Sequence, residues 1–193
     1  QRDKSNNNDI GYFHQNIFSY FEGCEVPQTG WDVIYRNPDG IVMPDGDIVH
    51  TLYVEMKNKH NTMNSASSAK TYIKMQSQLL DDDDCACFLV EAIAKHSQNA
   101  KWTTKVDGKN VQHRRIRRVS MDQFYAVVTG DENAFYKMCM ALPEVINEVV
   151  NEEGTVSVPK DTVISELKRV AELYTEETDD LAMAIAVYML GFN

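Results

Sequence analysis

Hydrophobic and polar positions along the chain predict a β-hairpin in its first third. The segment from Trp31 to Tyr35 is short and rich in aromatic and β-branched residues, and Ile48 to Lys57 has the same character over a longer run. Between them, Asn37 to Asp47 is dense in Asn, Pro, Asp and Gly, which predicts a turn. We therefore expect two strands that pair antiparallel across this turn.

Other segments carry apolar residues at helical spacing. The first spans residues 8–21, and a second, Ser67 to Leu80, follows a polar loop over Asn58 to Ser65. The sequence Ser120 to Gln123 fits a capping box, which predicts a helix that begins there and ends near Gly130. Four more helices are expected over residues 132–141, 143–152, 161–174 and 179–190.

The remaining segments predict further strands. Cys85 to Ala94 is almost continuously apolar apart from Glu91, as expected for a strand buried on both faces. Lys101 to Val119 fits a hairpin that turns at Asp107 and Gly108. Together the elements predict an α/β fold with a core sheet flanked by helices. We expect residues 1–150 to form the core with its binding elements, and residues 151–193 a C-terminal helical extension of the same domain.

Composition supports a soluble protein of one domain. The chain has 193 residues, of which 43% are hydrophobic and 25% charged. The longest candidate apolar stretch, Leu181 to Leu190, is half the length needed to span a bilayer, and the polar start from Gln1 to Asp9 does not fit a signal peptide. We expect a cytoplasmic bacterial protein. Because the chain does not begin with Met, we also expect the natural protein to be longer.

The four cysteines predict free thiols. Cys85 and Cys87 lie on one face of an apolar strand, and nothing else in the sequence indicates secretion. No CxxC or HxxxH spacing accompanies Cys24 or Cys139, so a zinc site is not expected.

Charge is distributed unevenly along the chain. The net charge is −10, which argues against strong non-specific binding to nucleic acid. However, the acids are concentrated after residue 130, whereas the stretch from Lys101 to Arg118 holds seven bases against Asp107 alone. A local phosphate-facing surface is compatible with this pattern, and composition alone does not decide the matter.

The segment from Tyr53 to Lys57 carries the strongest local signal. On a strand, Glu55 and Lys57 point to one face, while Val54 and Met56 point to the other. A carboxylate and an ammonium are thereby placed together above an apolar layer. Since Glu-x-Lys is a common pattern, an ordinary ion pair on a surface strand is the alternative interpretation.

A second carboxylate is expected across the hairpin. Asp32 and Glu55 are symmetric about residues 43–44, so antiparallel pairing puts them opposite or nearly opposite, ~5 Å apart. Two carboxylates at that distance fit one Mg²⁺. The pairs Pro38-Asp39 and Pro44-Asp45 compete for the role of the upstream acid, but they lie at the turn, over roughly 25 Å from Glu55. The run Asp81 to Asp84 predicts a solvated turn, with a metal site as its alternative.

These residues, with their flanks, resemble the PD-(D/E)xK nuclease superfamily, although Trp31 stands where its motif has proline. More closely, the chain resembles a small family of bacterial type II restriction endonucleases that cut GGNCC sites. The resemblance covers most of residues 5–140. It is carried by SNNNDIGYFHQNIF (5–18), GWDVIY (30–35), YVEMKNKHNTMNSASSAKTYIKMQ (53–76), LVEAIAK (89–95) and RIRRVSMDQFYAVVTGDENAF (115–135).

This resemblance implies magnesium-dependent hydrolysis of a DNA phosphodiester. Asp32 and Glu55 would hold the Mg²⁺, and Lys57 would position the attacking water and offset charge in the transition state. On the first helix, Gln15 is a candidate catalytic residue and His14 its neighbour; a helix-surface amide is the alternative for Gln15. Gln76 is a weaker candidate. For Glu91, a structural ion pair with a core arginine and an active-site role both stay open.

The resemblance also implies partners. A palindromic target on double-stranded DNA would be matched by a two-fold homodimer, and a DNA methyltransferase would protect the host site. The loop after the motif supplies candidate DNA contacts, with a capped helix start as the alternative for its polarity. In the basic stretch, strand alternation puts Arg115 and Arg117 on one face and Arg114 and Arg118 on the other, so only one pair is expected to meet DNA. The candidate DNA-binding residues are Lys59, His60, Asn61, Asn64, Arg115 and Arg117.

Two other functions compete with a restriction endonuclease. A repair or recombination nuclease with the same metal core would cut branched or damaged DNA. A non-catalytic DNA-binding protein on the same fold is the second alternative, and the intact set of Asp32, Glu55 and Lys57 argues against it.

Overall fold

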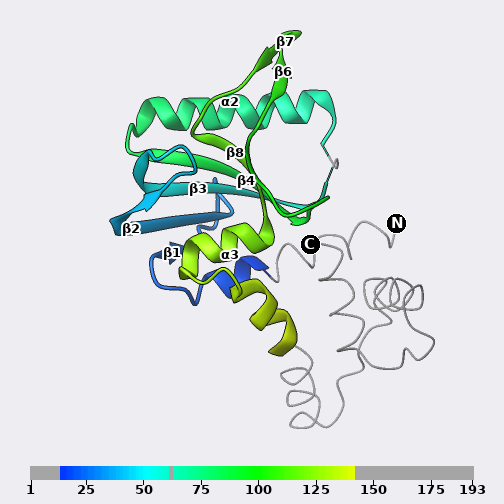
Figure 1. Cartoon of the computed structure of the whole chain (residues 1–193). Helices are drawn as coiled ribbons and strands as arrows, with labels where there is room; N and C mark the ends of the chain where they lie inside the picture. The colour runs from blue at the N-terminus through cyan, green and yellow to red at the C-terminus, as the bar shows by residue number, and fades with distance from the viewer. Residues whose placement is uncertain (1–13, 61–62, 142–193) are drawn as a thin grey trace, which may run out of the picture.

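The fold is built on one six-stranded mixed sheet. The computed structural model describes residues 14–60 and 63–141. The strands lie in the order β1-β2-β3-β4-β8-β5 (Figure 1). The pairs β3–β4 and β4–β8 are parallel, and the other three neighbouring pairs are antiparallel. The strands are β1 (Cys24–Glu25), β2 (Val33–Val42), β3 (Ile48–Lys59), β4 (Cys85–Ile93), β5 (Asn99–Lys101) and β8 (Ile116–Ser120).

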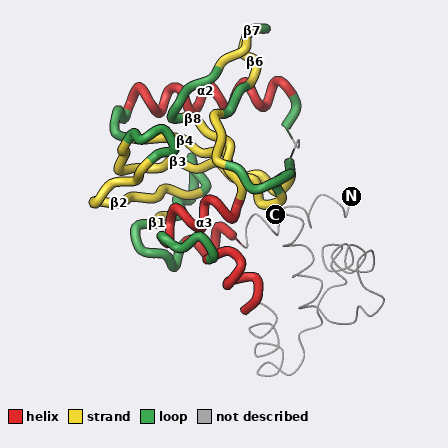
Figure 2. Tube along the Cα trace, viewed as in Figure 1, coloured by secondary structure: helices red, strands yellow, loops and turns green. Residues whose placement is uncertain are grey.

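Helices cover both faces of this sheet. The long helix α2 (Ser65–Asp81) lies along one face, and α3 (Met121–Thr129) lies against the other with residues 14–18, which are also helical (Figures 1 and 2). A further helix begins at residue 134 on the α3 side. The expected layout of a core sheet flanked by helices is confirmed over the described residues.

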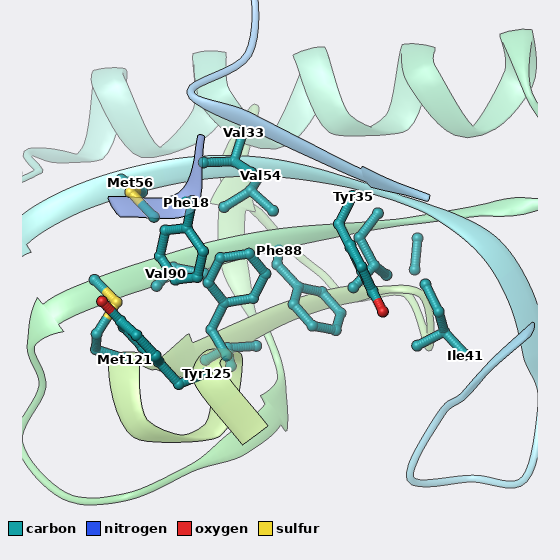
Figure 3. Close-up of a cluster of buried hydrophobic side chains, with 14 of the residues drawn as sticks. Phe18, Val33, Tyr35, Ile41, Val54, Met56, Phe88, Val90, Met121 and Tyr125 are labelled. Atoms are coloured by element: carbon teal, nitrogen blue, oxygen red, sulfur yellow. The ribbon is translucent and has the colours of Figure 1, made fainter. Parts of the chain in front are cut away.

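The two faces of β4 contribute to two separate hydrophobic cores. Phe88 and Val90 join the larger core beneath α3, which Figure 3 shows around Phe18 and Tyr125. Cys87 and Leu89 point the other way, into a smaller core under Tyr72 and Met75 of α2. Every residue from Cys85 to Ala92 is buried, which confirms a strand covered on both faces.

The hairpin of β2 and β3 is confirmed, but β2 is longer than expected. It continues to Val42 through Asn37–Gly40, which the sequence predicted as turn, and the register shifts between Arg36 and Ile41. The actual turn is tighter, with Met43 N–H bonded to the Asp47 carbonyl at 2.7 Å. Pro38 is tolerated because the short strand β1 pairs with β2 only as far as Tyr35, so none of the described strands pairs with the outer side of β2 at this point. Gly40 is required there, since its φ is +87° and a Cβ would lie 2.7 Å from Ile48 Cγ2.

The hairpin expected over Lys101 to Val119 is confirmed in part. A two-stranded ribbon of β6 (Thr104–Val106) and β7 (Lys109–Val111) turns at Asp107 and Gly108, both with positive φ, and projects past α2 (Figure 1). We call this ribbon the β6–β7 arm. The flanking segments β5 and β8 pair with each other in the main sheet instead. The prediction missed this division because strand patterns do not specify partners.

The helix α3 ends at Gly130 as predicted, with a left-handed φ of 71°. The prediction of a capping box at the start of this helix is wrong. Ser120 makes no side-chain cap bond; its hydroxyl instead accepts from Gln98 N–H at 2.9 Å and donates to Gln98 O. Gln123 donates to the Ser97 hydroxyl rather than returning to Ser120. A long-range backbone partner therefore replaces the local cap.

All four cysteines are free thiols, as predicted. Among residues 14–60 and 63–141, no helix combines the length and apolar character required to cross a bilayer. Several predictions lie outside the described residues: the start of the first helix, Asn61, the helices after residue 142, and the extension over residues 151–193 with the domain division that it implies.

Candidate active site

The register of the hairpin places Asp32 opposite Glu55. Val33 pairs with Val54 and Ile34 with Tyr53, so Asp32 and Glu55 are the next residues along the two strands. Beyond Val33 the pairing is offset by one residue, because Asp32 N–H donates to the Val54 carbonyl at 2.9 Å. The two acids therefore lie nearly opposite one another at this end of the hairpin. The register shift lies nearer the turn, after Arg36, so it does not disturb this end of the hairpin.

Glu55 and Lys57 share the face of β3 that α2 covers. Val54 and Met56, which alternate with them, are buried in the opposite core. Lys57 Nζ lies 2.8 Å from Glu55 Oε1. Burial raises the pKa of Glu55, but hydrogen bonds from Lys57 and Lys74 outweigh that effect, so the pKa of this carboxyl lies below its usual value. Glu55 is thus held as a carboxylate despite being only 19% exposed.

Asp32 is fixed by the backbone of the strand opposite it. Its Oδ2 accepts the N–H of Met56 at 2.6 Å. Burial is the largest influence on its pKa and the Glu55 charge acts in the same direction, so the pKa is raised even though the Met56 and Gln15 hydrogen bonds and the Lys57 charge oppose the shift. A cation bound between two such carboxylates would relieve both the desolvation and the mutual repulsion.

Gln15 reaches this pair from a different element. It lies on the helical segment 14–18, and its side chain hydrogen-bonds Asp32. The neighbouring His14 turns into the α3-side core, where its Nδ1 lies 3.2 Å from the hydroxyl of Tyr125. Of the two candidates on this helix, the structure brings only Gln15 to the acids.

Lys74 is the residue at this site that the sequence reasoning missed. It lies on α2, and its Nζ is 2.8 Å from Glu55 Oε2. The candidate named on the same helix, Gln76, is exposed. The helical phase held only part of the signal: Lys74 is half-buried at the edge of the helix face whose Tyr72 and Met75 are buried. The sequence pattern does not show at which residues α2 crosses β3, since tertiary packing determines that position.

A second charged cluster adjoins the motif on the same face. Glu91 pairs in register with Lys57 on the neighbouring strand and is 1% exposed. Arg118 contacts its Oε1, and Nδ1 of His60 lies 3.2 Å from its Oε2 and 3.0 Å from Arg118 Nη2. Of the two interpretations of Glu91, the structure therefore shows the ion pair with an arginine. Within the described residues, Arg118 Nε is buried without a hydrogen-bond partner.

Three other candidate DNA contacts make hydrogen bonds within the protein. Asn64 caps α2, its side chain accepting Ser67 N–H at 2.9 Å, which is the alternative foreseen for it. Arg115 Nε donates to Asp47 at 2.6 Å, and Arg117 is only 4% exposed with its Nε donating to Asn99 Oδ1 at 2.5 Å. A guanidinium committed in this way does not fit a residue that reads base edges.

The basic residues before β8 also depart from the expected alternation. Arg114 and Arg115 both contact Asp47, because they lie in the turn before β8 rather than on the strand. The Arg115 bond and the nearby Arg114 charge lower the pKa of Asp47, and this contact ties the β2–β3 turn to the start of β8. Of the four arginines between residues 114 and 118, only Arg118 is in line with Glu55 across the sheet, because Leu89 of β4 pairs with Glu55 on one side and with Arg118 on the other.

The donor set fits a hard cation with few protein ligands. Mg²⁺ takes oxygen ligands and commonly uses one or two carboxylates together with water and substrate phosphate. Asp32 and Glu55 supply that set. No group of three or more His, Cys, Asp or Glu residues suited to a metal occurs in the described part of the chain, the aspartates of 81–84 included. Asp84 instead pairs with His50 at 2.8 Å.

Comparisons with known proteins identify the family. A family model described as Eco47II restriction endonuclease matches residues 1–151. The chain is 28% identical over 156 residues to the type II restriction enzyme Sau96I of Staphylococcus aureus, covering 77% of this chain and 56% of that protein. It is 26% identical over 162 residues to the type II restriction enzyme Eco47II of Escherichia coli, covering 79% of this chain and 63% of that protein.

Because the family model covers most of the chain, the protein belongs to the Eco47II restriction endonuclease family. The resemblance to type II restriction endonucleases is thereby confirmed. The chain spans less than two thirds of the length of both relatives. No solved structure gives a significant match.

Proposed function

We propose that this protein is a type II restriction endonuclease that hydrolyses phosphodiester bonds of double-stranded DNA with Mg²⁺. The observation that carries the proposal is the gathering of Asp32, Glu55 and Lys57 on one face of the hairpin, with Lys57 Nζ 2.8 Å from Glu55. Two carboxylates, an ammonium and the Gln15 amide form the set that the PD-(D/E)xK chemistry of the sequence resemblance requires.

Asp32 and Glu55 would hold the Mg²⁺, which when bound supplies a Lewis acid and lowers the pKa of an attacking water. The chain's own residues orient the reaction. The Met56 N–H and the Gln15 side chain hold the Asp32 carboxylate in place. Lys57, whose side chain is 28% exposed, offers an ammonium that can position water and balance negative charge developing on the phosphate.

The substrate follows from the family resemblance more than from the geometry. A short palindromic site related to GGNCC, a two-fold homodimer to match its symmetry, a cytoplasmic location and a companion methyltransferase all belong to this proposal. His60 is the loop residue best placed to contact the backbone near the scissile phosphate, since it follows β3 and is held beside Lys57 by Glu91 and Arg118. Lys59 and Asn61 remain candidates from the sequence.

The proposal is tested by digesting a plasmid of known sequence with wild type and Lys57→Ala, in Mg²⁺ or in EDTA. We expect discrete fragments with wild type and Mg²⁺ that map to one short palindrome, and intact plasmid with the variant or the chelator. A matched control is Lys70→Ala, an exposed lysine on α2. Fragments that persist in EDTA would contradict the metal chemistry, and cleavage confined to branched DNA would favour a repair nuclease instead.

A further inference from the structure

Both oxygens of the Glu55 carboxylate are occupied by lysines of the chain itself. Lys57 Nζ lies 2.8 Å from Oε1, and Lys74 Nζ lies 2.8 Å from Oε2. Each carboxylate oxygen keeps a lone pair for a further ligand, but a divalent cation that binds this carboxylate meets the repulsion of two adjacent ammonium charges. If Glu55 is a metal ligand, as the proposed function holds, this repulsion favours the release of one of the two ammonium groups.

The two lysines differ in what else holds them. Lys57 is on the same strand as Glu55, two residues away, and its ammonium donates to that carboxylate. Lys74 has additional partners on the segment before Asp32: its Nζ donates to the Gly30 carbonyl at 2.5 Å and stands 3.9 Å from the centroid of the Trp31 ring. A carbonyl and an aromatic face stabilise an ammonium without a carboxylate. Lys74 can therefore leave Glu55 and still be accommodated.

The platform beneath Lys74 is itself anchored. Trp31 Nε1 donates to Gln78 Oε1 at 3.1 Å, and the Trp31 ring packs on Tyr53 with centroids 5.5 Å apart. Gln78 is one helical turn beyond Lys74 on α2, so the indole is tied to the same helix that carries the lysine. This arrangement keeps the ammonium close to the site after it releases the carboxylate.

We propose that Lys74 is a resident counter-ion of Glu55 that a divalent cation displaces onto Gly30 and Trp31. This inference rests on the proposed function. In the metal-free protein Lys74 offsets the Glu55 charge and competes with the cation for Oε2. In the loaded protein it stays beside the site as a positioning residue, with its charge free to face a DNA phosphate.

Trp31 gives this exchange a direct optical signal. An ammonium over an indole face perturbs its emission, and displacement of Lys74 from Glu55 changes that contact. The second tryptophan, Trp102, is 4% exposed and packs against Tyr72 in the α2-side core, so its emission is a steady background. Trp31→Phe removes the reporter while Lys74 keeps its contacts with Glu55 and Gly30.

The experiment is a Mn²⁺ titration of the whole chain without DNA, so that cleavage plays no part. Free Mn²⁺ is followed by electron paramagnetic resonance, and tryptophan emission is followed in a parallel titration with Mg²⁺, which is not paramagnetic and so does not quench the indole itself. Both are measured for wild type, Lys74→Met, Lys74→Arg, Lys70→Met, Trp31→Phe and Glu55→Gln. Circular dichroism and thermal unfolding establish that each variant is folded.

We expect Lys74→Met to bind Mn²⁺ about threefold to tenfold more tightly than wild type, the range left for one nearby charge after screening by solvent. Lys74→Arg and Lys70→Met should bind as wild type does. Emission should change on titration of wild type and not of Lys74→Met or Trp31→Phe. Equal or weaker binding by folded Lys74→Met, or the same gain in Lys70→Met, would overturn the proposal.

Glu55→Gln separates this inference from the one beneath it. If Glu55→Gln binds Mn²⁺ as wild type does, the cation does not use Glu55, and both the metal site of the proposed function and the role of Lys74 fail. If Glu55→Gln loses binding while Lys74→Met is unchanged, the metal site stands and the competition by Lys74 alone is wrong.

Discussion

The backbone N–H of Met56 donates to the carboxylate of Asp32 over 2.6 Å, which fixes the acid of one strand to the motif on the next. Replacing Asp32 by Asn keeps the shape of the side chain and removes its charge. We expect Asp32→Asn to lower the rate of DNA cleavage by at least ~10²-fold, because the carboxylate proposed to bind the metal is lost. Single-turnover cleavage measures the effect. Since burial raises the pKa of Asp32, the variant should unfold at the same temperature as wild type or at a higher one. If Asp32→Asn cleaves DNA as fast as wild type does, Asp32 does not bind the metal.

Gln15 acts on Asp32 from the helical segment 14–18. We expect Gln15→Ala to reduce kcat by about 10- to 100-fold with little change in KM, as found when a partner that orients a metal ligand is removed. The control is Asn16→Ala at the next, exposed position. A loss in KM alone would assign Gln15 to DNA binding, and equal losses in the two variants would indicate a general effect on the helix.

The buried pair of Glu91 and Arg118 should be a stability determinant. Removing one partner leaves the other as an uncompensated charge, so Glu91→Met and Arg118→Met are each expected to cost about 3 to 5 kcal/mol in free energy of unfolding. The double variant Glu91→Met with Arg118→Met should recover much of that loss, because it removes both charges. Urea unfolding of the two single variants and the double variant completes the cycle. Additive losses would show that the two side chains are not coupled.

The burial of His14 is expected to make the folded protein less stable in acid. Burial lowers the pKa of His14 from 6.5 to about 4. The unfolded chain therefore takes up a proton near pH 6.5 while the folded chain does not, so stability is full above that pH and falls as the pH drops towards 4. The loss should reach about 2 to 3 kcal/mol by pH 4.5. Urea unfolding at pH 7 and 4.5 should show a smaller difference for His14→Leu than for wild type; an identical difference would exclude His14 as the cause.

The β6–β7 arm carries exposed Lys105 and Lys109 on a ribbon that projects from the body of the protein (Figure 1). If the arm meets DNA, each lysine that neutralises a phosphate contributes roughly 0.9 to the slope of log affinity against log salt. Lys105→Ala and Lys109→Ala should each weaken binding and reduce that slope, as measured by fluorescence anisotropy in Ca²⁺. Lys137→Ala is the control, because this lysine is paired with Asp131. Slopes equal to that of the control would place the arm away from DNA.

Much of the candidate site is local information. The alternation of Val54, Glu55, Met56 and Lys57 determines which side chains share a face, because successive strand residues point to opposite sides of a sheet. The position of the turn then aligns the two strands, and their register from Val33 to Arg36 leaves Asp32 and Glu55 as the next residues along them. Sequence also sufficed for the buried strand β4 and the free cysteines.

Tertiary structure alone decided what approaches these residues from elsewhere. The contacts of Lys74 with Glu55 and of Gln15 with Asp32 depend on where helices cross the sheet. Arg117 illustrates the same limit in reverse: its charge favoured a DNA contact, but the pairing of β8 with β5 buries it against Asn99. The hydrophobic period of a segment determines the direction of its own side chains. It does not determine which distant segment packs on them, because that depends on the simultaneous burial of both hydrophobic cores.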